Sequence, residues 1–119
     1  MKTVLVVDDE FDLQQTICAT LAMGGYEPRA AGNGRDALAM IREAPPDLVL
    51  TDVMMPYMSG YDLVTAIRKL PGGQALPTVI MSSIDPALHP RGGWNRVLAK
   101  PFSLDLLLET VETLIGRSD

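Results

Sequence analysis

The sequence predicts an α/β domain built on a doubly wound parallel sheet with helices on both faces. Five short apolar runs alternate with longer segments in which apolar residues recur every three or four positions, the pattern of strands and crossover helices. Three of the runs are almost continuously apolar, which is typical of strands covered on both faces. With 119 residues, the chain is expected to form a single domain, residues 1–119.

The apolar runs have the length and composition of strands. The expected strands are TVLVV (residues 3–7), EPRAA (27–31), DLVLT (47–51), TVIMS (78–82) and RVLA (96–99). The second run contains Pro28, which has no amide hydrogen to donate to a neighbouring strand. Because proline is tolerated mainly at sheet edges, this run is expected at an edge.

Four further segments have the spacing of amphipathic helices, with an apolar stripe on the core side. In the first, Leu13, Ile17 and Leu21 recur at four-residue steps, and Gly24-Gly25 follows as a stop signal. The expected N-caps of the other three helices are Asn33, Ser59 and Ser103. Their short polar side chains can accept a hydrogen bond from the first turn of a helix.

The segment SIDPALHPRGGWNR, residues 83–96, stands where a further helix would connect the last two strands. Asp85 can cap a helix and Pro86 suits its first position, but Pro90 and Gly92-Gly93 follow closely. One helical turn is the most that this crossover is expected to form. The fourth helix of a regular alternation is therefore expected to be short or absent.

Composition argues against several classes of function. The net charge is −5 and lysines and arginines do not cluster, which argues against direct binding of nucleic acid. No apolar run approaches the ~20 residues of a membrane span, and the apolar start is too short for a signal peptide, so a cytoplasmic location is expected. The single Cys18 and the single His89 argue against a disulfide, a zinc site and a Ser-His-Asp triad.

Polar residues collect where the expected strands end. The first strand is followed by Asp8 and Asp9, and Asp52, Ser82 and Lys100 mark the ends of the third, fourth and fifth. In an open parallel sheet these ends share the edge at which ligands bind. Three carboxylates there would repel one another without a cation, and oxygen ligands suit Mg²⁺, with Mn²⁺ as the alternative. A lysine and a hydroxyl suit phosphoryl oxygens, so the set predicts phosphoryl transfer to a carboxylate.

Each of these residues also has an ordinary explanation when it is taken alone. A strand-end aspartate such as Asp9 is often a helix cap or a turn former. A strand-end lysine is usually a solvated surface residue. The prediction rests on the set, because its members follow different strands of one sheet.

Four motifs that carry these residues occur in order along the chain. They are VLVVDDE (residues 4–10), DLVLTDVMMPYMSGYDL (47–63), PTVIMSS (77–83) and LAKPF (98–102). Together they resemble the response-regulator receiver domain of two-component signalling, and the resemblance covers essentially the whole chain. It implies a flavodoxin-like sheet with the strand order 2-1-3-4-5.

The resemblance also implies a role for each site residue. Asp52 would be the phosphoacceptor, and Ser82 and Lys100 would bind the phosphoryl group. The ligands of Mg²⁺ would be Asp8, Asp9, Asp52 and the backbone carbonyl of Met54. In addition, Pro56 and Gly60 match the family's loop after the phosphoacceptor, and the Lys100-Pro101 bond matches one that is often cis there.

By the same resemblance, the phosphoryl donor would be a sensor histidine kinase or a histidine phosphotransfer protein. The chain would be a signalling switch and not an enzyme, with only slow intrinsic autophosphorylation and autodephosphorylation. It would control an unidentified output partner, without direct contact to nucleic acid or membrane, as a monomer or a weak phosphorylation-dependent dimer.

Two alternative functions remain open. A degenerate receiver would have lost its chemistry and would serve only as a scaffold, although the acid, hydroxyl and lysine set is intact here. An aspartyl-phosphate phosphatase would also use a carboxylate nucleophile and Mg²⁺. Enzymes of that class carry a D-x-D motif at the first strand, with the nucleophile and the general acid or base two residues apart. Here the nucleophile candidate is on the third strand, and Met54 occupies the position two residues after it.

The chain departs from the family's pattern in two places. Val97 stands where most members carry an aromatic residue, and the crossover of residues 83–96 is several residues short.

Trp94, within this crossover, either packs on the sheet or belongs to a mobile segment that reorders when the phosphoacceptor is phosphorylated. The resemblance also implies that the side chains of residues 54 and 84 flank the approach of water to an aspartyl phosphate. Here they are the apolar Met54 and Ile84, which predicts a long-lived phosphoryl group; the alternative is that both simply pack against neighbouring residues.

Overall fold

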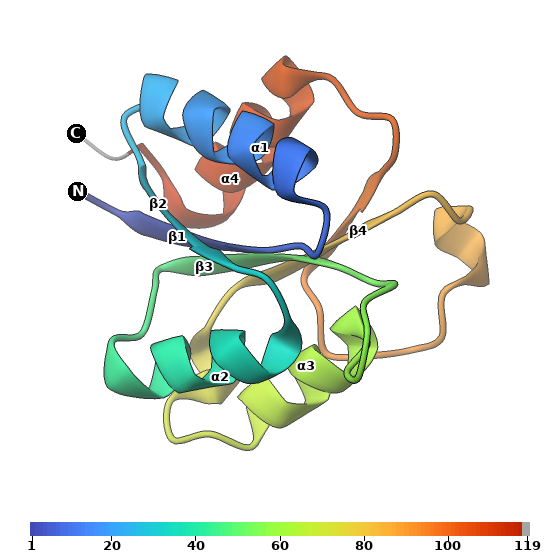
Figure 1. The fold of residues 1–119 in the computed structure, drawn as a ribbon. Coiled ribbons are helices and arrows are strands. Elements are labelled where there is room, and N and C mark those ends of the chain that lie inside the picture. Colours follow the sequence, from blue (N-terminus) through green and yellow to red (C-terminus); the bar gives the residue numbers. More distant parts are fainter. Residues whose placement is uncertain (118–119) are drawn as a thin grey trace.

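The structure, a computed structural model, describes residues 1–117 and contains a five-stranded parallel sheet (Figure 1). Its strands are β1 (Thr3–Val7), β2 (Glu27–Ala31), β3 (Leu48–Asp52), β4 (Thr78–Ser82) and β5 (Arg96–Ala99). The order across the sheet is β2-β1-β3-β4-β5. This confirms the expected order and places the proline-containing β2 at an edge.

One strand boundary differs from the prediction. β3 begins and ends one residue later than its apolar pattern indicates, at Leu48 and Asp52. Asp47 lies before the strand, where its carboxylate accepts a hydrogen bond from the Thr3 amide at 2.7 Å. At the other end, Asp52 pairs with Met81 of β4. The backbone of Asp52 is therefore held by the sheet ladder itself.

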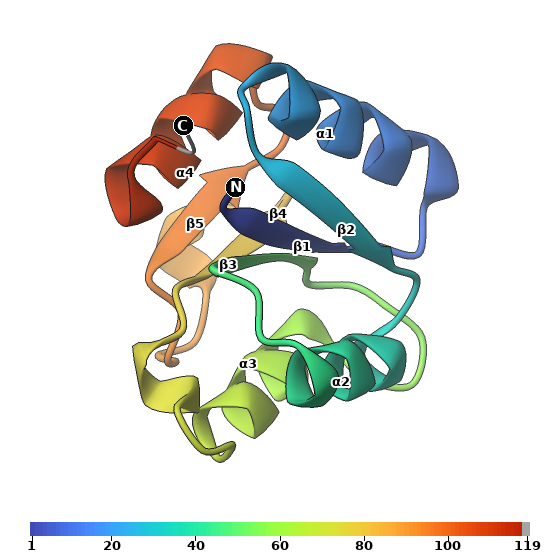
Figure 2. The ribbon, with the colours of Figure 1, turned by 90° about the vertical axis from the view of Figure 1, so that its left-hand side faces the viewer.

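In the described residues, four α-helices cover the two faces of the sheet. They are α1 (Phe11–Met23), α2 (Gly34–Glu43), α3 (Gly60–Arg68) and α4 (Leu104–Ile115). Figures 1 and 2 show α1 and α4 on one face and α2 and α3 on the other. Alternate residues of β1 serve the two faces: Val4 and Val6 belong to the core beneath α1 and α4, and Leu5 and Val7 to the core beneath α2 and α3. Burial on both faces explains the continuous apolar runs.

The three helix starts that were predicted from N-cap residues are confirmed. The side chains of Asn33, Ser59 and Ser103 each accept a hydrogen bond from an amide in the first turn of α2, α3 and α4. At α3 the Ser59 hydroxyl accepts from the Asp62 amide at 3.1 Å, and the Asp62 carboxylate accepts in return from the Ser59 amide. This capping box satisfies two amides that the helix itself cannot.

The crossover between β4 and β5 contains one short turn, the 3₁₀ helix η2 (Pro86–Leu88). Asp85 caps it, because its carboxylate accepts a hydrogen bond from the Ala87 amide at 3.0 Å. Figure 1 shows the rest of the crossover as a long loop. This confirms that the fourth helix of the expected alternation is reduced to a single turn. A second 3₁₀ turn, η1 (Gly73–Ala75), precedes β4.

Trp94 is half-buried and packs beside the sheet, on residues of β4 and α3. Its ring lies 5.2 Å from that of Tyr61, measured between centroids, and both rings border the buried side chains of Val64 and Ile80. The Tyr61 hydroxyl is also hydrogen-bonded to His89 Nδ1. Of the two interpretations of Trp94, the structure has the packed arrangement, and its movement on phosphorylation stays a prediction.

Candidate functional site

The polar residues at the strand ends meet at one edge of the sheet. Asp8 and Asp9 follow β1, Asp52 and Ser82 are the last residues of β3 and β4, and Lys100 follows β5. We call these five residues the rim. Because β1, β3, β4 and β5 are successive neighbours in the sheet, their carboxyl ends lie side by side. Carboxylate oxygens of Asp8, Asp9 and Asp52 all lie within 4.8 Å of one another.

Asp8 is the most buried of the three acids, with 1% of its surface exposed. One of its oxygens, Oδ1, accepts a hydrogen bond from the Glu10 amide at 2.9 Å, and the other, Oδ2, is buried with no hydrogen-bond partner among residues 1–117. Burial raises the pKa of the Asp8 carboxyl, and the negative charge of Asp52 acts in the same direction, whereas the Glu10 amide lowers it. A buried oxygen with no donor is costly in a folded protein, and a cation is one partner that would offset this cost.

Asp52 is held from two sides. Its Oδ1 lies 3.2 Å from Lys100 Nζ and accepts a hydrogen bond from the Val53 amide at 3.0 Å. Lys100 is placed by its own amide, which donates to the Ser82 carbonyl at 2.7 Å. The Lys100-Pro101 bond is cis, as the resemblance implies. The lysine and the carboxylate are thus held together by contacts within the protein.

Gly60 allows α3 to begin directly against the end of β3. A Cβ atom added at Gly60 would lie 2.2 Å from the Asp52 carbonyl oxygen, far closer than two such atoms approach. The Gly60 amide donates to the Val53 carbonyl at 2.8 Å. Any larger residue would push the loop that follows Asp52 away from the strand.

Ser82 lies buried at the end of β4. Its Oγ accepts a hydrogen bond from the Ile84 amide at 3.0 Å, which uses the oxygen and leaves the hydroxyl hydrogen to donate elsewhere. Met54 and Ile84, the two apolar residues of interest for water access, have 74% and 42% of their surfaces exposed. Neither side chain belongs to the buried core.

Gln14 is a buried polar residue that the sequence reasoning did not single out. Its Nε2 lies 2.7 Å from the Ala31 carbonyl oxygen and 3.3 Å from those of Val6 and Asp8. A signal was available, because position 14 lies three residues before Ile17 and therefore on the core side of α1. A polar residue there must find a buried partner.

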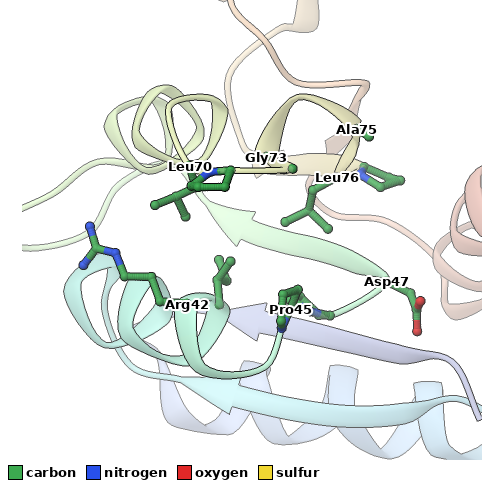
Figure 3. A pocket seen from close by; sticks show the side chains of 12 residues that line it. Arg42, Pro45, Asp47, Leu70, Gly73, Ala75 and Leu76 are labelled. Atoms are coloured by element: carbon green, nitrogen blue, oxygen red, sulfur yellow. The ribbon is translucent and has the colours of Figure 1, made fainter.

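A groove of about 620 Å³ lies at the opposite edge of the sheet, near the amino ends of β3 and β4 (Figure 3). Leu70, Leu76 and four prolines contribute to its largely apolar lining, and Figure 3 shows Arg42 and Asp47 on opposite sides of the view. No rim residue lines it. The groove brings together no set of reactive side chains, whereas the rim brings together three carboxylates, a hydroxyl and a lysine.

No helix within residues 1–117 is both long enough and apolar enough to cross a membrane.

The comparisons with known proteins agree with the fold. The family described as response regulator receiver domain matches residues 4–112. A response regulator receiver protein of Anaeromyxobacter sp. is 36% identical over 111 residues, which cover 92% of this chain and 47% of that protein. The chain spans about half the length of the curated relatives that it matches.

Two solved structures place the fold in the same family. The chemotaxis response regulator CheY4 of Vibrio cholerae has a TM-score of 0.91 at 34% identity, covering 96% of this chain and 98% of that one. The receiver domain of the sensor histidine kinase PA1611 of Pseudomonas aeruginosa, which has a magnesium ion in its active site cleft, has a TM-score of 0.87 at 27% identity, covering 97% and 98%. The chain therefore belongs to the response regulator receiver domain family of two-component systems.

Proposed function

We propose that this receiver domain is a phosphorylation switch in which Asp52 accepts a phosphoryl group in a Mg²⁺-dependent reaction. The donor would be the phosphohistidine of a sensor histidine kinase or of a histidine phosphotransfer protein, and the phosphorylated form would control an output partner. One observation carries the proposal: the Asp52 carboxylate contacts Lys100 and lies within 4.8 Å of two further acids, one of which has a buried, unpartnered oxygen.

The residues present fit a hard divalent cation. Asp8, Asp9 and Asp52 offer three carboxylate oxygens close together, and Asp8 Oδ2 has no other partner among the described residues. Oxygen ligands of this kind suit Mg²⁺ or Mn²⁺, and by family resemblance the Met54 carbonyl would join them. When bound, the cation neutralises the carboxylates and the charge of an approaching phosphoryl group.

The side chains of the rim would divide the remaining work. An Asp52 oxygen forms a bond to phosphorus as the bond from phosphorus to the histidine ring nitrogen breaks, and the electron pair of that bond stays on the ring. Lys100, already 3.2 Å from Asp52 Oδ1, would then bind a phosphoryl oxygen as a point charge. Ser82 would donate its hydroxyl hydrogen to another phosphoryl oxygen, since its own oxygen accepts from Ile84.

The domain would be a switch with slow intrinsic chemistry and not an enzyme that turns over a substrate. The alternative of a degenerate scaffold is disfavoured by the contact between Lys100 and Asp52 and by the unpartnered oxygen of Asp8. The alternative of an aspartyl-phosphate phosphatase is disfavoured by Met54, because its thioether cannot act as the general acid or base that such an enzyme needs.

Incubation with acetyl phosphate tests the proposal directly. We expect the protein to gain one phosphoryl group, detected by mass spectrometry, only when Mg²⁺ is present, and we expect Asp52→Ala to gain none. The matched control is Asp36→Ala, because Asp36 is an exposed acid at the start of α2. Incorporation into Asp52→Ala at the rate of the parent protein would exclude Asp52 as the acceptor.

Titration with Mg²⁺ tests the metal site separately. Asp9→Asn should weaken Mg²⁺ binding far more than Asp36→Asn, and binding to the parent protein should weaken as the pH falls, because protonated carboxylates are poor ligands. Calorimetric titration measures both effects. Equal losses from the two substitutions would place the metal elsewhere.

A further inference from the structure

We propose that Gln14 is a positioning residue for the metal site: its side-chain amide fixes the backbone that carries Asp8 and Asp9 and thereby sets the affinity of the rim for Mg²⁺. This inference rests on the proposed function of the rim. Gln14 itself contacts backbone carbonyl oxygens and not the carboxylates that would bind the metal.

The geometry connects one side chain to two strands. Gln14 is 94% buried (6% exposed) on the face of α1 that covers the sheet. Its Nε2 reaches the carbonyl oxygen of Ala31, the last residue of β2, and the carbonyl oxygens of Val6 and Asp8. The Asp8 amide donates to the same Ala31 oxygen at 3.1 Å. Gln14 therefore holds β1 and β2 together at the point where the chain leaves β1 for the acid pair.

The orientation of the Gln14 amide follows from its neighbours. All three groups within reach are carbonyl oxygens, which only accept hydrogen bonds, so the nitrogen and not the oxygen must face them. An amide nitrogen has two hydrogens, so it serves two of these carbonyls at any moment, and Ala31 is the nearest. A side chain without such hydrogens would remove these bonds and leave the Ala31 oxygen with only the donor that the Asp8 amide supplies.

The consequence for the metal is one of placement. The Asp8 carboxylate has one oxygen fixed by the Glu10 amide and one oxygen without a partner, and both belong to the turn whose carbonyl Gln14 holds. If that turn relaxes toward water, the carboxylates of Asp8 and Asp9 no longer converge at the spacing seen here. Groups that orient metal ligands typically contribute about 10- to 100-fold to metal affinity.

The test compares the same substitution at adjacent positions. Gln14→Met removes the donor while keeping length and charge, and Gln15→Met makes the identical change at an exposed neighbour on α1. Calorimetric titration with MgCl₂, without a phosphoryl donor and well below the unfolding temperature of each variant, should show Kd raised about tenfold for Gln14→Met. The Gln15→Met protein should bind as the parent does.

Two results would overturn the inference. One is a Gln14→Met protein that unfolds at a lower temperature but, while folded, binds Mg²⁺ as tightly as the parent, since that is the behaviour of a merely structural residue. The other result concerns Gln14→Asn, which is used if Gln14→Met does not fold. This variant keeps an amide, but its side chain is shorter by one methylene group and the amide lies farther from the three carbonyls. An unchanged affinity of Gln14→Asn for Mg²⁺ would also overturn the inference. Failure of the parent protein itself to bind Mg²⁺ would instead refute the proposed function, so the two failures are distinguishable.

Discussion

The rim is joined at Ser82 to the crossover, which spans residues 83–95 because β5 begins at Arg96, but the polar groups of the two regions are arranged differently. Within residues 1–117, two buried side-chain atoms lack a hydrogen-bond partner, Asp8 Oδ2 in the rim and His89 Nε2 in the crossover. In the rim, the unpartnered atom belongs to a carboxylate surrounded by other carboxylates. In the crossover, the unpartnered atom belongs to the His89 imidazole, whose other nitrogen is hydrogen-bonded to the Tyr61 hydroxyl. An unpartnered carboxylate oxygen is the more costly of the two and the better ligand for a cation.

Side-chain hydrogen bonds hold the crossover, which has no α-helix to pack against the sheet. The Arg68 guanidinium donates to the Gly93 carbonyl and to the Asn95 side chain, and on its other edge to the carbonyls of Gly73 and Leu76. These bonds join the end of α3, the turn before β4 and the end of the crossover. The rim therefore forms without a regular helix after β4, because other side chains hold the loop in place.

The largest effect on stability is expected from Arg68→Met, which tests whether the crossover is held in this way. Loss of the guanidinium leaves several carbonyls without their donor, and hydrogen bonds to charged groups are strong, so the free energy of unfolding should fall by about 3 kcal/mol. Urea denaturation measures it. The matched control is Arg42→Met, also in the last turn of a helix, with a loss below about 1 kcal/mol.

The same variant distinguishes the two regions. If the rim is independent of the crossover, Arg68→Met should bind Mg²⁺ with the affinity of the parent protein. A loss of affinity as large as that caused by Asp9→Asn would show that the crossover also positions the rim.

A smaller effect is expected for the lifetime of the phosphoryl group. Met54 and Ile84 are exposed and apolar, so neither can hydrogen-bond and orient a water that attacks the phosphorus of phosphorylated Asp52. Met54→Asn/Ile84→Glu should lose its phosphoryl group on the order of tenfold faster, equivalent to about 1.4 kcal/mol of barrier. The decay is followed after removal of the donor. Met23→Asn, at the exposed end of α1, is the control, and decay of the double variant at the parental rate would exclude control by these two side chains.

A further effect concerns the metal-free rim and pH. Burial and the charge of Asp52 raise the pKa of Asp8 in the folded protein above its value in the unfolded chain. The folded state then binds the proton more tightly, so stability should fall as the pH rises from the unfolded pKa through the raised folded one. Asp8→Asn cannot titrate and should lack this fall. At pH 7 without Mg²⁺ it should unfold at a higher urea concentration than the parent, while binding Mg²⁺ poorly.

Urea titrations of both proteins across pH 4 to 8, with and without Mg²⁺, measure this difference. Mg²⁺ should stabilise the parent protein and not Asp8→Asn, because a ligand that binds only the folded state raises its stability. An Asp8→Asn protein that is less stable than the metal-free parent at pH 7 would show that the Asp8 carboxylate contributes a net favourable interaction.

The smallest signal is expected in the emission of Trp94, which tests communication between the regions. The Ile84 amide at the start of the crossover donates to Ser82 Oγ, so a Ser82 hydroxyl that turns toward a phosphoryl group alters this bond. The change would reach Trp94, whose ring packs against that of Tyr61 at an interplanar angle of 37°. We expect a shift in emission when Mg²⁺ and beryllofluoride are added, and none in Asp52→Ala. Unchanged emission of the parent, with binding verified by calorimetry, would mean that the crossover does not respond.

Local sequence was sufficient for features whose contacts are local. The caps at Asn33, Ser59 and Ser103 bond to amides three residues away, so their residue types indicate them directly. The single turn at Pro86 follows from proline and glycine placement in the same way. The edge position of β2 could be predicted because Pro28 lacks a donor.

The composition of the rim was also predictable, for a topological reason. Parallel strands direct all their carboxyl ends to one edge, so acids, a hydroxyl and a lysine at those positions in the sequence had to come close together. The one-residue shift of β3 was not predictable from apolarity, because Thr51 and Asp52 join the ladder through backbone pairing with Ile80 and Met81, which is indifferent to side-chain polarity.

By itself, then, the sequence determined the strand–helix alternation, three of the helix caps, the shortened crossover and the residues of the rim, since each depends on near neighbours or on strand direction. Only the tertiary structure decided how Gln14, Arg68 and Trp94 are used. Arg68 bonds to residues 25 and 27 positions away, and Gln14 bonds to one 17 positions away on another strand. Such partners are chosen by the packing of distant elements, and a buried donor accepts whichever carbonyl the fold brings within reach.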